Sequence, residues 1–188
     1  VRAARADAIA ETGLDADATD VEVADALREL MASDVKSTPL KTLQGILWAE
    51  GFAAGEIHSQ FFEDVPPRLR AWHESGIRLA VYSSGSVASQ VPWFRHAPQG
   101  DLTPLVEDFF DTVSAGPKKE SGSYDRIAAA LGVAPGRALF LTDHPDEVAA
   151  ALAAGWQVVA LDRAGEPWHG AEFAAPSVAS FDEIALSR

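Results

Sequence analysis

The chain contains no cysteine, which excludes disulfide bonds, thiolate nucleophiles and cysteine zinc sites. Long apolar runs are also missing: no stretch approaches the roughly 20 consecutive apolar residues of a membrane-spanning helix. The N-terminal sequence VRAARADAIAETG has two arginines with no apolar stretch behind them, so it does not match a secretory signal. These absences favour a reducing compartment, and we expect a cytoplasmic protein.

Basic residues are scarce as well, with 15 Lys and Arg against 28 Asp and Glu and a formal net charge of −13. A surface of that charge repels nucleic acid and anionic membranes, so we expect neither as a partner. The same charge repels a free phosphate ester. A phosphate site in this chain therefore needs local positive charge, which a lysine, a helix N-terminus or a divalent cation could supply.

The 188 residues, 47% of them hydrophobic, suffice for one α/β domain with a small insertion. Residues 1–60 read as helical, with helices predicted at about 1–11, 20–32 and 38–51. Beyond residue 60 the pattern predicts strands at 77–82, 109–113, 138–141 and 156–161, alternating with helices at 65–75, 87–94, 124–131 and 147–154 and a weak final helix. This alternation predicts an α/β fold with a Rossmann-like parallel sheet and flanking helices.

Ligand sites of such sheets lie at the carboxyl ends of the strands. The first predicted strand, IRLAVY, ends in Ser83-Ser84-Gly85-Ser86. Hydroxyl groups followed by glycine and a helix N-terminus offer both O–H and backbone N–H donors to an oxyanion. The alternative is an ordinary serine N-cap and turn.

The second predicted strand leads to Gly116-Pro117-Lys118-Lys119-Glu120-Ser121. A lysine in such a loop can hold a phosphoryl group as a point charge. The alternative is a solvated basic loop, and spacing alone does not say which lysine points inward.

The third predicted strand ends in Thr142-Asp143-His144-Pro145-Asp146-Glu147. An acid directly after an apolar strand, with two more within four residues, suits a hard cation that prefers oxygen ligands. The alternative is helix-start chemistry, because a capping residue followed by proline and acids also begins a helix well.

The order of these three motifs is more informative than any one of them. Hydroxyl, lysine and acid at the ends of successive strands resemble the haloacid-dehalogenase phosphatases. The strings LKTLQGILWAEGF, FFEDVPPRLRAWHESGIRLAVYSSGSVASQ, GPKKESGSYDRIA and LFLTDHPDE resemble, more closely, the enolase-phosphatases of methionine salvage, from about residue 38 to about residue 165.

The resemblance implies a Mg²⁺-dependent enzyme with a helical cap, acting as a monomer on a small-molecule phosphate ester. Its substrate would be 2,3-diketo-5-methylthiopentyl 1-phosphate, converted to an acireductone and phosphate. Ser83 and Ser84 match the substrate-binding hydroxyls, and Lys118 matches the phosphate-binding lysine. Asp143 matches the magnesium ligand, and Glu147 the second acid of that motif. Another small-molecule phosphatase of the same superfamily is the alternative.

The nucleophile of that family, the first acid of a D-x-E-G-T-like motif after a central strand, has no match here. Asp15-Ala16-Asp17 follows no apolar strand, and we interpret it as a helix connection. We therefore expect residues 1–60 to be part of a helical cap and residues 61–188 to be an α/β core lacking its first strand. Such a chain would fold poorly alone, because unpaired strand edges cost about 1–3 kcal/mol for each buried group. If Val1 were the true start, the chain would be a non-catalytic phosphate-binding remnant.

Overall fold

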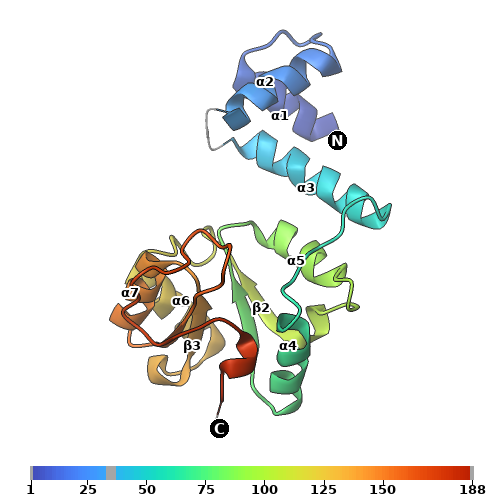
Figure 1. Ribbon diagram of the computed structural model, residues 1–188. Coiled ribbons are helices and arrows are strands. Elements are labelled where there is room, and N and C mark those ends of the chain that lie inside the picture. The colour runs from blue at the N-terminus through green and yellow to red at the C-terminus, as the bar shows by residue number, and fades with distance from the viewer. Residues whose placement is uncertain (1, 33–36, 187–188) are drawn as a thin grey trace. The chain divides into compact units, whose positions relative to one another are not determined.

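The computed structural model describes residues 2–32 and 37–186. It divides the chain into two units, residues 1–58 and residues 59–188. Helices alone make up the described part of the first unit, whereas the second unit combines strands and helices (Figure 1).

The helices of the first unit are α1 (Arg2–Thr12), α2 (Asp20–Ala32) and α3 (Thr38–Ala53). Side-chain hydrogen bonds cap the starts of α2 and α3. The N–H of Thr19 donates to the Glu22 carboxylate over 2.7 Å ahead of α2, and the N–H of Leu40 donates to the Ser37 hydroxyl over 3.1 Å in α3. Such caps satisfy N–H groups that have no partner within the helix. The helices bury a small apolar cluster of Ala8, Ile9, Ala18, Val23, Leu27 and Leu40.

The Asp15-Ala16-Asp17 segment lies in the connection between α1 and α2, and all three residues are exposed. Its interpretation as a helix connection is therefore confirmed.

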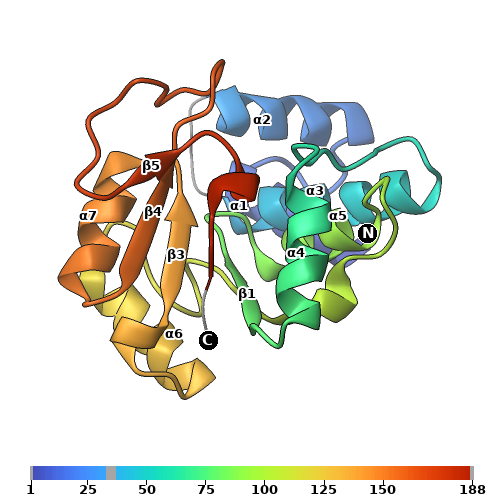
Figure 2. The ribbon, with the colours of Figure 1, turned by 60° about the horizontal axis from the view of Figure 1, so that its bottom comes forward.

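Short parallel strands form two sheets in the second unit. The first sheet pairs β1 (Leu79–Tyr82) with β2 (Val106–Phe110). The second has the order β3 (Leu139–Thr142), β4 (Gln157–Leu161) and β5 (Ser177–Val178), with β3 and β4 side by side in Figure 2. The predicted parallel α/β fold is confirmed. Within the described residues, β1 pairs only with β2 and β3 only with β4.

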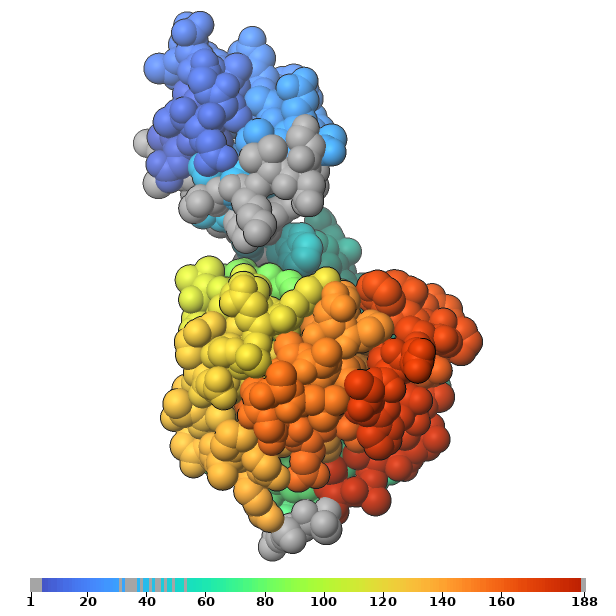
Figure 3. All heavy atoms as spheres, turned by 90° about the vertical axis from the view of Figure 1, so that its left-hand side faces the viewer, coloured from blue at the N-terminus to red at the C-terminus, as the bar shows by residue number. Residues whose placement is uncertain are grey.

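Helices and 3-10 turns flank these strands. The helices are α4 (Val65–Glu74), α5 (Val87–Arg95), α6 (Ser121–Leu131) and α7 (Pro145–Ala153), and the turns span Thr103–Leu105, Pro135–Arg137 and Phe181–Glu183. The segments from α6 to the C-terminal stretch, yellow to red, share one continuous surface in Figure 3. None of the described helices is both long and apolar enough to span a membrane.

An aromatic cluster joins the two sheets where no strand pairing does. Tyr124 of α6 is fully buried, and its ring centroid lies 5.7 Å from that of Tyr82 and 5.1 Å from that of Phe140. Trp156 adds an edge-on contact at 5.6 Å from Tyr124. Because Tyr82 belongs to β1 and Phe140 to β3, α6 links the strand ends that carry the predicted site.

Some predicted boundaries are wrong. The strand expected at 109–113 ends at Phe110, because the Asp111 side chain folds the next residues into a turn. Helix α6 begins at Ser121 instead of residue 124, and α3 continues past Gly51 to Ala53. In place of a final helix, the C-terminal segment forms β5 and one 3-10 turn.

Candidate active site

The serine loop after β1 is fixed to the end of β2. The N–H of Ser83 donates to the Phe110 carbonyl over 3.1 Å and so extends the pairing of the two strands. The buried amide of Gln90 donates to the carbonyls of Gly85 and Phe110 over 2.7 and 2.9 Å. Ser83 is half-buried and its hydroxyl accepts from the N–H of Gly85, whereas Ser84 is exposed. The loop therefore presents hydroxyl groups on a fixed backbone.

Asp111 is a site-building residue that the sequence analysis missed. The residue is 8% exposed, and its carboxylate accepts the N–H groups of Val113, Ser114 and Val87 over 2.9, 2.8 and 3.1 Å. Burial alone would raise the pKa of Asp111, but the three N–H groups lower it on balance. Its position directly after an apolar strand and three residues before a serine is the signal for such a turn. Because Val87 begins α5, part of that helix N-terminus is already occupied by this carboxylate.

Lys118 has its ammonium group within an aromatic and acidic surrounding. Its Nζ lies 2.7 Å from Oε2 of Glu147, and 5.8 and 5.7 Å from the ring centroids of Tyr82 and Phe140. Only 18% of its side chain is exposed, against 56% for Lys119, whose Nζ lies 3.2 Å from Asp146. Spacing alone did not say which of the two lysines points inward. In the structure it is Lys118.

Glu147 is buried, with 7% of its surface exposed, and its Oε2 also accepts the Thr142 hydroxyl over 2.6 Å. Glu147 Oε2 therefore connects Lys118 to Thr142 at the end of β3. The expectation that Glu147 ligates a metal stays a prediction, and ligation through Oε2 would compete with these contacts.

Asp143 lines a cavity of about 220 Å³ beside the end of β3. Arg163 and Glu166, which follow β4, line the same cavity, together with apolar side chains that include Phe62 and Phe181. Within the described residues, no group of three or more acidic or histidine side chains is placed to hold a metal ion. Asp143 can thus offer one carboxylate to a cation, and further oxygen ligands must come from other groups or water.

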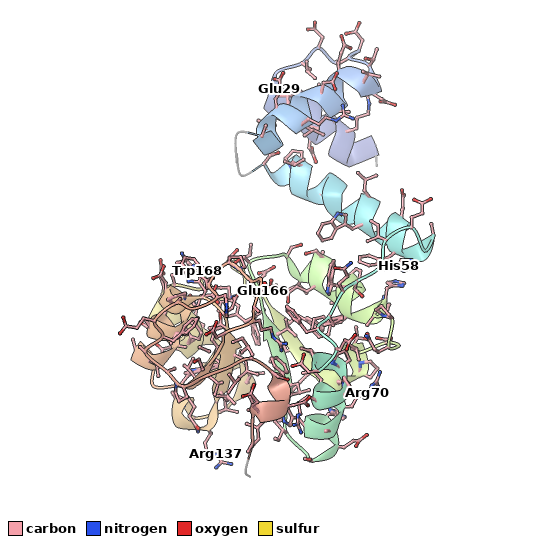
Figure 4. The ribbon with its side chains drawn as sticks, in the orientation of Figure 1. Glu29, His58, Arg70, Arg137, Glu166 and Trp168 are labelled. Atoms are coloured by element: carbon pink, nitrogen blue, oxygen red, sulfur yellow. The ribbon has the colours of Figure 1, made fainter. Side chains whose placement is uncertain are left out.

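His144 and Trp168 add an aromatic pair at this edge of the unit. Their ring centroids lie 4.5 Å apart, and Nδ1 of His144 accepts the N–H of Asp146 over 3.1 Å. Glu166 and Trp168 lie close together on the loop after β4, while Arg137, which precedes β3, lies at the opposite end (Figure 4).

Lys118 contacts residues that lie beside the other two predicted motifs. It packs on Tyr82, the neighbour of Ser83, and its partner Glu147 accepts from Thr142, the neighbour of Asp143. Hydroxyl groups after β1, the ammonium group of Lys118 and a carboxylate after β3 can bind a phosphoryl group and a divalent cation.

Known proteins resemble the chain in sequence and in fold. Residues 4–155 match the haloacid dehalogenase-like hydrolase family. Among solved structures, the UTR4 protein of Saccharomyces cerevisiae is 26% identical with a TM-score of 0.77, covering 96% of this chain and 88% of that one. CbbY from Rhodobacter sphaeroides, in complex with phosphate, shares the fold with a TM-score of 0.60 at 21% identity, covering 89% of this chain and 68% of that one.

Curated relatives are more similar still. The protein named enolase-phosphatase E1 of Streptomyces avermitilis is 59% identical over 81% of this chain and 64% of its own length. Its namesake from Saccharopolyspora erythraea is 52% identical over 98% of this chain and 78% of its own length. The chain thus spans about two thirds to three quarters of these relatives. It belongs to the haloacid dehalogenase-like hydrolases and, among them, to the enolase-phosphatase E1 proteins.

Proposed function

We propose that the complete protein is an enolase-phosphatase that converts 2,3-diketo-5-methylthiopentyl 1-phosphate to an acireductone and inorganic phosphate. Membership of the enolase-phosphatase E1 proteins supports this choice of substrate and its place in methionine salvage. The sheet-edge chemistry around Lys118 supports the phosphatase step.

The placement of Lys118 is the observation that carries the proposal. Its side chain is only 18% exposed in a protein whose formal net charge is −13. One N–H faces Glu147, which leaves donors for the oxygens of a phosphoryl group. A fixed positive charge beside the transferring oxygens is a main source of catalysis in phosphoryl transfer.

Other residues at this edge would complete the grip on the substrate. The hydroxyl groups of Ser83 and Ser84 would donate to phosphoryl oxygens from the fixed loop after β1. Asp143 would hold Mg²⁺, whose charge, when the ion is bound, would help to neutralise the same oxygens. Glu147 would orient Lys118 through their 2.7 Å contact.

We also propose that the space between β1 and β3 receives a further parallel strand that carries an aspartate nucleophile. Two features support this: in the described part of the chain neither strand has a partner on that side, and Asp143 of the cavity lies at the end of β3. Residues 1–60 would form part of the cap and residues 61–188 the core. Residues 1–188 alone should then unfold without a cooperative transition, and a cooperative melt of that fragment would contradict the idea.

Purified complete protein should be assayed with the diketo phosphate and with a panel of sugar phosphates, each with and without Mg²⁺. We expect Mg²⁺-dependent release of phosphate with a preference for the diketo phosphate. A preference for a sugar phosphate would favour another small-molecule phosphatase. Phosphate binding without hydrolysis of any ester would identify a non-catalytic protein instead.

A further inference from the structure

The backbone of the loop before Lys118 is held by side chains at every residue from Ala115 to Lys118. Nε of Arg126 donates to the Ala115 carbonyl, and the Tyr82 hydroxyl donates to the Gly116 carbonyl over 2.6 Å. The next two carbonyls are held from α6. The Ser123 hydroxyl donates to Pro117 and the Tyr124 hydroxyl to Lys118, each over 2.7 Å. Each of these four consecutive carbonyls thus accepts a hydrogen bond from a side chain. A surface loop does not need so many side-chain donors, because water can donate to its carbonyls instead.

Side chains of α6 pack closely against Gly116. Gly116 has φ +102°, and a Cβ at this position would lie 2.2 Å from Nη2 of Arg126 and 2.8 Å from Oγ of Ser123. Arg126 in turn donates to the Ser123 hydroxyl over 3.1 Å. Arg126 and Ser123 are therefore fixed to each other as well as to the loop.

Tyr124 connects the loop to the acid that faces Lys118. Its hydroxyl lies 2.7 Å from the Lys118 carbonyl and 3.3 Å from the Glu147 carbonyl, so one oxygen bridges the backbones of both members of the ion pair. Burial, with Glu147 and Tyr82 adding, raises the pKa of Tyr124, so the hydroxyl keeps its proton at any pH used for an assay.

We propose that Ser123, Tyr124 and Arg126 are positioning residues, which set the loop so that the ammonium group of Lys118 meets a phosphoryl oxygen. This inference rests on the proposed function for the role of Lys118. The inference gives a role to the S-Y-x-R segment of α6. Two hydroxyl groups and a guanidinium group of this segment donate to the backbone of the lysine loop, and packing alone does not explain that arrangement. A lysine side chain is long and flexible, so its backbone must be fixed for its charge to act at one point.

The test uses the complete protein with Ser123→Ala and Tyr124→Phe, which remove one oxygen each. Ser59→Ala is the matched control, because Ser59 is also fully buried and its hydroxyl donates to the His96 carbonyl over 2.8 Å, away from Lys118. Two quantities are measured for each variant, namely kcat/KM for the diketo phosphate and the Kd of inorganic phosphate by calorimetry. Thermal melts report how much each substitution disturbs the fold.

We expect Ser123→Ala and Tyr124→Phe to weaken phosphate binding and lower kcat/KM by about 10-fold, the effect of one lost hydrogen bond on the lysine loop. Ser59→Ala should lower Tm by a similar amount and leave both quantities near the wild type. In a Lys118→Met background, Ser123→Ala and Tyr124→Phe should have no further effect on phosphate binding. A purely structural role predicts that all three variants change kcat/KM and the phosphate Kd alike. It also predicts that Ser123→Ala and Tyr124→Phe weaken phosphate binding equally with and without Lys118. Either result overturns the proposal.

The two proposals fail in different ways. Wild-type protein that binds phosphate but does not hydrolyse the diketo phosphate defeats the proposed function, while the comparison of phosphate Kd values still decides the role of Ser123 and Tyr124. Wild-type protein that binds no phosphate defeats both. If one variant does not fold, the other decides the outcome with the same control.

Discussion

The buried ion pair between Asp64 and Arg163 should be a large contributor to the stability of the second unit. Asp64 precedes α4, and its carboxylate receives both Nη atoms of Arg163 at 2.9 and 2.7 Å. Both side chains are 12% exposed. The same carboxylate accepts the Phe181 N–H over 2.6 Å and the Ser180 hydroxyl over 3.0 Å. The pair therefore ties the start of the unit to its C-terminal segment.

Asp64→Asn removes the negative charge and leaves the Arg163 guanidinium nearly buried without a counter-ion. Breaking a buried pair in this way costs about 3–5 kcal/mol, a large share of the roughly 5–15 kcal/mol that stabilises a domain. With about 2–4 °C of Tm for each kcal/mol in a protein of this size, Tm should fall by at least roughly 6 °C. Stacking of Arg163 on Phe62, at 4.2 Å from the ring centroid, does not replace the lost charge.

The assay is urea and thermal unfolding of the complete protein at neutral pH. Arg163→Met should cost less than Asp64→Asn, because Asp64 would keep the Phe181 N–H and the Ser180 hydroxyl. The double variant should cost clearly less than the sum of the single ones. Glu107→Gln is the control, since the Arg78–Glu107 pair is also two-pronged, at 2.5 Å, but about half exposed, so water screens it.

Acid provides an independent check on the same pair. The hydrogen bond from Arg163 holds the pKa of Asp64 well below its ordinary value, with help from Phe181 and Ser180 and against the effect of burial. A depressed pKa stabilises the fold above about pH 4, the ordinary range of aspartate, and this stabilisation is lost as the pH falls toward the folded-state pKa. The gap in stability between wild type and Asp64→Asn should therefore narrow below about pH 4. Additive single variants, or a gap that is constant with pH, would refute the reasoning.

Three further outcomes follow from the site. Lys118→Met should lower kcat/KM for the phosphate ester by at least roughly 100-fold in a steady-state assay, because it removes a fixed charge next to the transferring oxygens. Asp111→Asn should destabilise the protein by about 1–3 kcal/mol in urea unfolding, since one amide oxygen cannot accept three N–H groups as a carboxylate does. Gly116→Ala should reduce both Tm and phosphate affinity, because its Cβ would lie 2.2 Å from Arg126; an unchanged phosphate Kd would show that the loop tolerates displacement.

The sequence predicts the strand-end motifs well because they depend on neighbours along the chain. An apolar run followed by Ser83, or by Thr142 and Asp143, shows where a buried strand gives way to polar residues. In the structure these strands belong to two sheets, which Tyr124 of α6 joins by packing against Tyr82 of β1 and Phe140 of β3. The roles assigned to Ser83, Ser84, Lys118, Asp143 and Glu147 stay predictions until variants are measured.

Contacts between distant segments were beyond the reach of such patterns. Asp64 and Arg163 are 99 positions apart, and no local spacing connects them. The partner of Lys118 depends on the direction of the Glu147 side chain, whose Oε2 also accepts the Thr142 hydroxyl over 2.6 Å. At Asp111, the apolar pattern predicted that the strand continues. It ends instead, because three backbone N–H groups donate to the Asp111 carboxylate and form a turn. The two-residue strand β5 is too short to leave a pattern at all.

The length of the string GPKKESGSYDRIA has a physical reason in the contacts of α6. From this string, the phosphate site needs only the ammonium group of Lys118, which one residue supplies. Fixing that group needs a glycine where φ is positive and a Cβ would collide, and donors whose side chains reach backward over six to eleven residues. Because helical residues at adjacent positions point in different directions, Ser123, Tyr124 and Arg126 each reach a different carbonyl of the loop. A substitution of Arg126 should therefore be tolerated only when other contacts keep Gly116 in its conformation. We expect an Arg126→Lys variant to bind phosphate more weakly than wild type, because lysine cannot reproduce the planar guanidinium fork.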